Sequence, residues 1–305
     1  MKTWHKVIIS DARNMKQIRD NSIHLMVTSP PYPMIEMWDK QFRKIDRTID
    51  NLWESVGKEK ETSEKERLIN KIYELMHENL AQVWKETYRV LVEGGIACIN
   101  IGDATRSING IFRLFPNHSK IIEHCEKIGF VTLPFILWKK PTTKPKYKGK
   151  GAFLGSGMLP PNAYVTQDCE FILIFRKGTL RKFEPHDPLR YQSVYTKEER
   201  NNWFTQIWED IVGVKQSLSS MERRAAAFPE EIPQRLIKMF SIIGDIVLDP
   251  FIGTGTTTKV ARELKRNSIG YEIEPAFLPP IEEKMRIPQK KLMDDAEFEI
   301  IVGKS

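Results

Sequence analysis

A serine, two prolines and a tyrosine stand directly after an apolar run, in the stretch VTSPPYPMIEMWD from Val27 to Asp39. Pro30 and Pro31 fix φ near about −65° and have no amide donor, so they present carbonyl oxygens in a rigid frame. The hydroxyl of Ser29 adds a hydrogen-bond acceptor and the ring of Tyr32 adds an aromatic face. Such a turn can hold a polar group of a ligand still. The alternative is a rigid turn around a packed tyrosine.

A second stretch, VLDPFIGTGTTTKVA, runs from Val247 to Ala261. An apolar strand leads into a turn with two glycines and a threonine-rich helix start, where free backbone amides can meet a ligand. About twenty residues later Glu272 ends the next apolar run, where a carboxylate can accept the hydroxyls of a ribose. No lysine stands next to Thr256 or Thr257, so this is not a Walker loop. The pattern favours an adenosine-containing ligand over a turn that only packs a helix on a strand.

The composition is that of an ordinary globular protein. With 305 residues, 41% of them hydrophobic and 29% charged, the chain can form one large domain with an insertion or two modest domains. Apolar runs fall short of the ~20 residues of a membrane helix and MKTWHKVIIS does not resemble a signal peptide, so we expect a cytoplasmic protein. Cys98, Cys125 and Cys169 are widely spaced without a CxxC pattern, which favours reduced core thiols over disulfides or a zinc site. The net charge of +7 permits nucleic-acid binding.

Apolar periodicity predicts strands that alternate with helices. Residues 5–10 and 23–29 are expected to be strands that flank a short polar helix, and a long amphipathic helix is expected from Glu66 to Gly94-Gly95. Helices are also predicted at 120–127 and 256–266. Further strands are predicted at residues 96–103, 131–138, 169–175, 245–249 and 267–273. This alternation indicates a largely parallel α/β sheet with helices on both faces.

Two segments lack such periodicity. Residues 138–157 place lysines beside glycines, which is typical of a loop that grips phosphates or of a solvated loop. These lysines include Lys139, Lys144, Lys146, Lys148 and Lys150. Residues 177–224 hold arginines, amides and the tryptophans Trp203 and Trp208, which predicts a small inserted region whose tryptophans could equally belong to a core.

With TSPPY and DPFIGTGTT in one chain, the sequence resembles the S-adenosylmethionine-dependent DNA amino-methyltransferases, and its TSPPY form is similar to that of the cytosine-N4 members. The catalytic motif precedes the cofactor loop, as in the group called beta. The resemblance covers most of the chain. It implies a circularly permuted Rossmann-like methyltransferase sheet, mostly parallel with one antiparallel strand, a small inserted target-recognition region, and S-adenosylmethionine as the cofactor.

The resemblance also implies the cofactor contacts. The strand at 5–10 would be the third strand of the cofactor half, moved to the front by permutation, with Asp11 near the adenine. Phe228 in AAAFPEEIPQRLI would contact the methionine part, although Arg223-Arg224 stands where relatives often have His-Pro. The remaining contacts would be Asp249, Pro250, Phe251, Gly253, Thr254, Gly255, Thr256, Thr257 and Glu272.

Catalysis would fall to Ser29, Pro30, Pro31 and Tyr32. The lone pair of an exocyclic amine is delocalised into the base, so the Ser29 hydroxyl and the Pro30 carbonyl would each accept one N–H and aim the lone pair at the methyl group. Tyr32 would stack on a base flipped out of the duplex, a contact worth about 1–3 kcal/mol. We expect no metal. Methylation at cytosine C5 is disfavoured because no cysteine follows a proline.

Double-stranded DNA is the expected partner, with a cognate restriction endonuclease acting separately. The lysines of residues 139–150 would contact phosphates, and residues 179–222 would read base edges. The expected division is 1–178 for the catalytic half, 179–222 for target recognition and 223–305 for the cofactor-binding half. Adenine-N6 methylation, a catalytically silent nucleic-acid-binding relative and a small-molecule methyltransferase stay open as alternatives, as does the oligomeric state.

Overall fold

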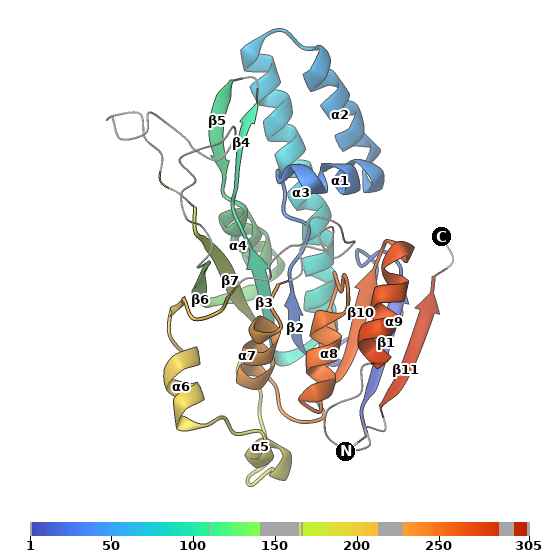
Figure 1. Ribbon diagram of the computed structural model, residues 1–305, viewed down its shortest axis with the longest axis vertical. Coiled ribbons are helices and arrows are strands. Elements are labelled where there is room, and N and C mark those ends of the chain that lie inside the picture. Colours follow the sequence, from blue (N-terminus) through green and yellow to red (C-terminus); the bar gives the residue numbers. More distant parts are fainter. Residues whose placement is uncertain are drawn as a thin grey trace.

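The computed structural model describes residues 2–108, 110–140, 165, 167–212, 228–286 and 296–303. A nine-stranded sheet runs through this part of the chain (Figure 1). Its strands in spatial order are β11 (Glu297–Val302), β1 (Trp4–Ile9), β10 (Asn267–Glu272), β9 (Ile246–Asp249), β2 (Ile23–Thr28), β3 (Leu91–Ile101), β7 (Cys169–Lys177), β6 (Phe130–Lys139) and β8 (Ile207–Trp208).

Neighbouring strands of this sheet are parallel except where β7 takes part. β7 runs antiparallel to both β3 and β6. The prediction of a mostly parallel sheet with one antiparallel strand is therefore confirmed. β1 lies between β10 and β11, although it stands at the other end of the sequence. The N-terminal strand thus completes the half of the sheet that carries the glycine loop, as the permuted order predicts.

Helices cover both faces of the sheet. One face carries α3 (Thr62–Val90) and α4 (Asn117–Ile128), and the other carries α7 (Glu231–Phe240), α8 (Thr256–Glu263) and α9 (Leu278–Arg286) (Figure 1). Alternate residues of β2 show the two cores. Met26 packs in the core that contains Trp84 of α3, whereas Leu25 and Val27 pack in the core that contains Leu236 of α7. Because both faces are buried, the strands read as continuous apolar runs.

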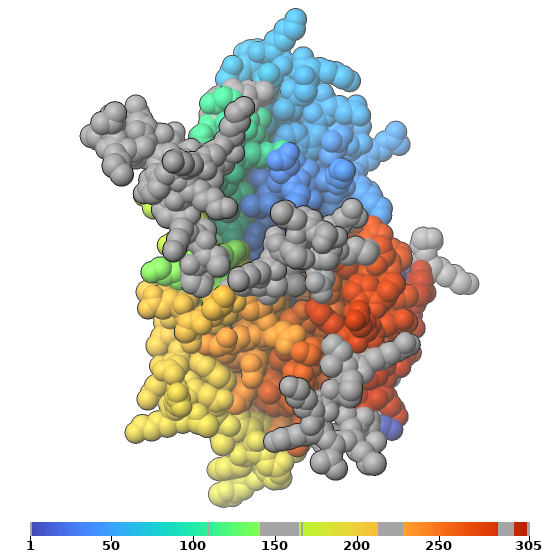
Figure 2. All heavy atoms as spheres, in the orientation of Figure 1, coloured from blue at the N-terminus to red at the C-terminus, as the bar shows by residue number. Residues whose placement is uncertain are grey.

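A helical lobe stands beyond the carboxyl ends of the parallel strands. It consists of η1 (Glu36–Trp38), α1 (Asp39–Ile45), α2 (Arg47–Lys58), the N-terminal part of α3, and the hairpin of β4 (Ala104–Ile108) and β5 (Ile111–Phe115). Figure 2 shows the blue and cyan atoms of this lobe at one end of the visible face, yellow atoms at the other end, and orange and red atoms between them. Helices α1 and α2 were not predicted, although the apolar residues Ile49, Leu52, Trp53 and Val56 of α2 recur at helical spacing.

The prediction of a short polar helix between β1 and β2 is wrong. Residues 11–22 form turns that pass over the C-terminal end of α3. The guanidinium of Arg89 in α3 donates hydrogen bonds to the carbonyl oxygens of Met15 (3.0 Å) and Ile18 (3.1 Å). Carbonyl groups that a helix would have paired internally are bound here by a side chain from another element.

The end predicted for the long helix is also wrong. The helix ends at Val90, and the chain continues at once as β3, which contains Gly94-Gly95. Gly94 has φ +75°, and the register between β2 and β3 shifts in this region. A Cβ added to Gly94 would lie 2.2 Å from the backbone nitrogen of Arg181. The glycine therefore allows an irregular strand to approach another backbone, and it does not cap the helix.

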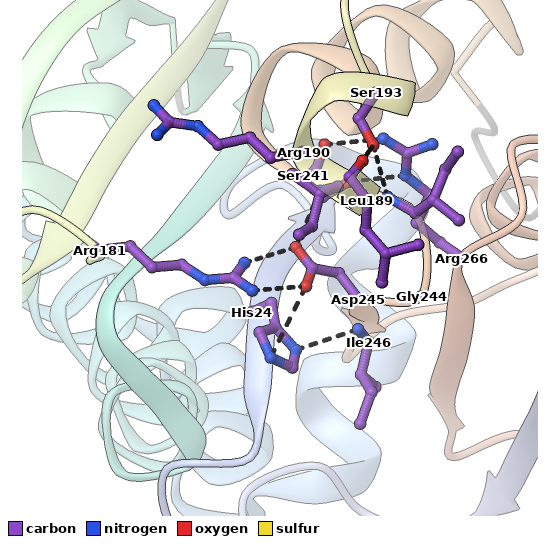
Figure 3. A network of polar contacts seen from close by, with 12 residues as sticks. His24, Arg181, Leu189, Arg190, Ser193, Ser241, Gly244, Asp245, Ile246 and Arg266 are labelled. Carbon is purple, nitrogen blue, oxygen red and sulfur yellow. Dashed lines mark hydrogen bonds and ion pairs between the residues drawn. The ribbon is translucent and has the colours of Figure 1, made fainter. Parts of the chain in front are cut away.

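A polar network at the amino edge of the sheet joins the segment after β7 to β2 and β9 (Figure 3). The buried carboxylate of Asp245 accepts two hydrogen bonds from the Arg181 guanidinium, at 2.6 and 2.8 Å. The backbone N–H of Ile246 donates to Nδ1 of His24 (3.1 Å), whose Nε2 lies 3.7 Å from Asp245. Burial lowers the pKa of His24, so the imidazole is neutral at pH 7. The network fixes Arg181 at the edge opposite the strand carboxyl ends.

Replacing Gly94 by alanine is expected to lower the free energy of unfolding by about 2–4 kcal/mol, because the added Cβ meets backbone atoms at a positive φ. Gly57→Ala in α2 is the matched control, since an added Cβ there meets no atom within 4 Å. Its stability should equal or slightly exceed that of the wild-type protein. Urea unfolding followed by circular dichroism measures both variants. If Gly94→Ala were as stable as the wild-type protein, the close approach of Gly94 to the backbone of Arg181 would be contradicted.

Candidate active site

A cavity lies between the carboxyl ends of the parallel strands and the helical lobe. Phe42 of α1 and Leu80 of α3 line it from the lobe, and Phe277 of η3 (Pro275–Phe277) lines it from the other side. Seven of the predicted site residues also line it: Asp11, Ser29, Pro31, Pro250, Phe251, Gly253 and Glu272. The proline-rich turn and the glycine loop, far apart in the sequence, therefore face one space.

Glu272 ends β10 at the wall of this cavity. Its side-chain oxygens accept hydrogen bonds from the backbone N–H groups of Gly253 (3.1 Å) and Glu274 (2.9 Å). Burial raises the pKa of Glu272 to about 7 against these hydrogen bonds. Each carboxylate oxygen has a further lone pair, so hydroxyl donors of a ligand can still bind. This fits the role predicted for a carboxylate that binds a ribose.

The glycine loop places its backbone at the cavity and its threonines away from it. Gly253 and Gly255 have φ of +52° and +88°, which L side chains rarely adopt. The hydroxyls of Thr254 and Thr256 bind Nζ of Lys284 in α9, at 2.6 and 3.1 Å. The structure therefore brings Gly253 to the cavity, while Thr254, Gly255 and Thr256 lie outside its lining.

Asp249 lies beneath the loop and not in the lining of the cavity. It is 3% exposed, and it accepts hydrogen bonds from the hydroxyls of Thr28 and Thr257, both at 2.6 Å. The backbone N–H of Phe251 is a third donor, at 3.1 Å. Burial raises the pKa of Asp249 to about 6 although these donors lower it. Asp249 and Thr257, predicted as cofactor contacts, thus join the end of β2 to β9 and α8.

Phe228 and Asp11 lie in different surroundings. Phe228 packs with Ile232 in the core between α7 and the sheet, away from the cavity lining. Asp11 lines the cavity, but its carboxylate binds Nε and Nη2 of Arg13, at 2.8 and 2.6 Å. Arg13 also donates to Asn79 of α3. The wall at Asp11 therefore carries a carboxylate and guanidinium pair, and the sequence analysis missed Arg13.

The turn after β2 carries a hydrogen-bonded tyrosine. The hydroxyl of Ser29 donates to Oη of Tyr32 (3.1 Å), and the Tyr32 hydroxyl donates to Oε2 of Glu170 (2.9 Å). Nδ2 of Asn100 donates to both Oη of Tyr32 (2.8 Å) and Oε2 of Glu170 (2.7 Å). Burial, followed by the charge of Glu170, raises the pKa of Tyr32 well above its usual value, so the phenol stays neutral. Tyr32 and the buried Pro30 lie just outside the cavity lining.

Asn100 and Glu170 were missed by the sequence analysis. Asn100 lies near the end of β3 and Glu170 near the start of the adjacent β7. Lys140 forms an ion pair with Oε1 of Glu170. Among the described residues, Oδ1 of Asn100 is buried without a hydrogen-bond partner. A polar residue inside an apolar strand was the available signal, because such a residue is buried at a cost unless it has partners.

The expected DNA-contacting residues are described only in part. Lys139 is half-exposed, with Nζ 3.6 Å from Glu209. Lys144, Lys146, Lys148 and Lys150 lie outside the described residues. In the expected recognition region, α5 (Pro188–Gln192) follows the segment fixed at the amino edge, and α6 (Lys197–Trp203) precedes β8. Trp208 is 1% exposed and its ring faces Arg235 of α7 at 5.0 Å, so it belongs to the core.

The described part of the chain contains no cluster of three potential metal-ligating side chains. Its helices include none that is both long and apolar enough to cross a membrane. Cys98 and Cys125 are buried free thiols, and burial raises the pKa of both, while Cys169 is partly exposed.

Known proteins resemble this chain in sequence and in fold. Residues 23–283 match the N6_N4_Mtase family, described as DNA methylase. The chain is 66% identical to the Type II methyltransferase M.MjaI of Methanocaldococcus jannaschii over 299 residues, which covers 98% of this chain and 97% of that protein. The match therefore extends over almost the whole length of both proteins.

Solved structures show the same architecture. TTHA0409 of Thermus thermophilus, complexed with S-adenosyl-L-methionine, aligns with a TM-score of 0.72 and 31% identity over 99% of both chains. PvuII DNA methyltransferase, which is cytosine-N4-specific, aligns with a TM-score of 0.60 and 16% identity over 96% of this chain and 92% of that one, a likeness of fold alone. The mixed sheet is that of a methyltransferase, and the chain belongs to the N6_N4_Mtase family of DNA methylases.

Proposed function

We propose that the protein transfers a methyl group from S-adenosylmethionine to the exocyclic N4 amine of a cytosine flipped out of duplex DNA. It would be the modification enzyme of a restriction-modification system, with the endonuclease acting separately. The observation that carries the proposal is the shared cavity, which Ser29 and Pro31 of the turn line together with Gly253 of the loop and Glu272 at the end of β10. A base held by the turn would therefore face a ligand held by the loop.

The residues of the cavity suit S-adenosylmethionine. Glu272 offers a buried carboxylate to ribose hydroxyls, and Phe251 and Phe277 offer apolar surface to a purine. The complex of TTHA0409 with this molecule, at 31% identity, supports the assignment. When bound, S-adenosylmethionine supplies an electrophilic methyl carbon on a sulfonium centre. The chain itself supplies orientation and hydrogen-bond acceptors.

Ser29 is oriented as an acceptor for the amine of the base. Its own proton points to Oη of Tyr32, so its lone pairs are available for an N–H of the base. The carbonyl of Pro30 would accept the second N–H, in a backbone that two prolines hold rigid. Two acceptors on one amine draw its lone pair out of the ring system, and their fixed positions make this preorganisation. Cytosine N4 is proposed as the target because serine occupies the first position of the turn, as in the cytosine-N4 enzymes it resembles.

Ser29→Ala is expected to lower DNA methylation by about 10²-fold or more, because one acceptor for the amine is removed. The wild-type protein, labelled S-adenosylmethionine and duplex DNA of mixed sequence are incubated, and the DNA is digested to nucleosides for mass spectrometry. The expected product is N4-methylcytosine. Ser55→Ala, an exposed serine on α2, is the matched control with wild-type activity.

Two results would contradict the proposal in different ways. N6-methyladenine as the product would overturn the choice of base and leave the methyl-transfer chemistry in place. If no methylated nucleoside were found with several DNAs, the proposed methyltransferase activity would be contradicted and a nucleic-acid-binding role would be favoured.

Binding of S-adenosylmethionine is expected to weaken as the pH falls below about 7. Glu272, with its pKa of about 7, is protonated below that pH and then presents one acceptor fewer to a ribose. The loss approaches about tenfold in affinity per pH unit if only the ionised form binds. Titration calorimetry at pH 6, 7 and 8 measures it. Glu272→Gln should bind more weakly at pH 8 and vary less with pH, and an equal pH dependence of both proteins would refute the role of Glu272.

Replacing Lys146, Lys148 and Lys150 together by alanine is expected to flatten the salt dependence of DNA binding. For each lysine that no longer binds a phosphate, the slope of log affinity against log salt falls by about 0.9. Fluorescence anisotropy with a labelled duplex at several salt concentrations measures the slope. Lys127→Ala, a lysine on α4 whose side chain is 66% exposed, is the control. An unchanged slope in the triple variant would exclude phosphate binding by these lysines.

A further inference from the structure

A chain of hydrogen bonds leads from Ser29 into the protein. Ser29 donates to Tyr32, and Tyr32 donates to Glu170. Asn100 donates to both of the latter residues. Lys140 pairs with the second oxygen of Glu170. The segments that meet here are the turn after β2, the end of β3, the start of β7 and the residue after β6.

The direction of these hydrogen bonds follows from the chemistry of Glu170. A carboxylate only accepts hydrogen bonds, so the side-chain amide of Asn100 must turn Nδ2, and not Oδ1, towards Glu170. If Oδ1 of Asn100 stood 2.7 Å from Oε2 of Glu170, the two oxygens would repel each other. The same Nδ2 group donates to Tyr32, whose single proton is then directed to Glu170. The phenol oxygen is left to accept the proton of Ser29. The lone pairs of Ser29 consequently point away from the chain and are free for a substrate.

We propose that Glu170 is the terminal proton acceptor of the methyl-transfer reaction, acting through Tyr32 and Ser29. This inference rests on the proposed function, because it requires an amine bound at Ser29. Glu170 does not touch the base in this scheme. It is a positioning residue that sets the polarity of the chain and takes up the proton at its far end.

Each proton moves one position along this chain of hydrogen bonds. As the amine nitrogen bonds to the methyl carbon, the bond between that carbon and the sulfonium sulfur breaks and its electron pair stays on sulfur. An N–H bond of the amine also breaks, and its proton passes to Oγ of Ser29. The original Ser29 proton passes to Oη of Tyr32, and the original Tyr32 proton passes to Oε2 of Glu170. The amine, serine and tyrosine end neutral, and the carboxylate becomes a carboxylic acid. No tyrosinate forms, which agrees with the strongly raised pKa of the buried Tyr32.

Other carboxylates near the turn are occupied elsewhere. Asp249 binds Thr28, Thr257 and the backbone of Phe251. Asp103 binds Nδ1 of His118 at 2.8 Å. Within the described part of the chain, Glu170 is the carboxylate that hydrogen bonds connect to Ser29 through Tyr32.

The test is single-turnover methylation at saturating S-adenosylmethionine and DNA. Glu170→Gln keeps the size of the side chain but cannot take up a proton, so the rate constant should fall roughly a hundredfold. Tyr32→Phe removes one oxygen from the same chain and should slow the reaction similarly. The double variant should be no slower than the slower single variant, because both changes break one pathway. Glu123→Gln, a glutamate on the surface of α4, is the matched control with the wild-type rate.

Binding and stability separate this role from a structural one. The dissociation constants for S-adenosylmethionine and DNA, measured for each variant, should stay at wild-type values, as should thermal unfolding. If Glu170→Gln does not fold, Tyr32→Phe carries the test alone through its rate at saturation. A wild-type rate in either folded variant, a loss confined to binding, or multiplicative effects in the double variant would overturn the relay.

The wild-type protein in the same assay tests the function on which the relay rests. If it methylates no DNA, the proposed function fails. If it methylates DNA and the variants match its rate, the relay alone fails. If it methylates adenine, the base assignment changes, and the comparison of variants still decides the relay because an adenine amine also loses one proton.

Discussion

A buried carboxylate holds the two halves of the active site together. Asp249 accepts hydrogen bonds from Thr28, at the end of β2, and from Thr257, in the first turn of α8. The next residues along the chain, Ser29 and Pro250, both line the cavity. Parallel neighbouring strands bring their ends to one edge, and the carboxylate fixes how those ends stand relative to each other. Burial raises the pKa of Asp249 to about 6, so it opposes the ionised form of the carboxylate that accepts these hydrogen bonds.

Three acidic side chains near the cavity have different hydrogen-bond partners. Asp249 accepts hydrogen bonds from two hydroxyls and one backbone amide, and these bonds connect the end of β2 to the glycine loop and α8. Glu272 accepts from two backbone amides and borders the cavity, which leaves lone pairs for a ligand. Glu170 is bound by a lysine, an amide and a phenol that leads towards the base site. Environment, more than residue type, therefore distinguishes the structural role of Asp249 from the ligand-binding and proton-accepting roles proposed for Glu272 and Glu170.

The sheet, its permuted order and the meeting of the turn with the glycine loop were predictable, because long apolar runs and two short motifs determine them. Helix α1 was not, since Phe42 is its one buried residue. Helix α2 carried a signal that was missed, because Ile49, Leu52, Trp53 and Val56 recur at helical spacing. Asn100 and Glu170 were not predictable either, since they are 70 positions apart and meet only through pairing of β3 with β7. Sequence likeness placed Asp249 at the cofactor, whereas the fold places it under the loop. Local sequence patterns predict helices and strands. Hydrogen bonds between polar residues of different strands can be identified only once the order and pairing of the strands in the sheet are known.

The position of β1 has a consequence for biosynthesis. This strand leaves the ribosome long before β10 and β11, the two strands between which it lies. Until they arrive, its hydrogen-bonding edges are unpaired and its contacts are with chain not yet made, a state prone to chaperone binding. The cavity also draws its walls from residues near both ends of the chain, from Ser10 to Phe277. A nascent chain therefore carries the proline-rich turn after β2 before the walls supplied by Glu272 and Phe277 have been made, so the cavity is completed only late in synthesis.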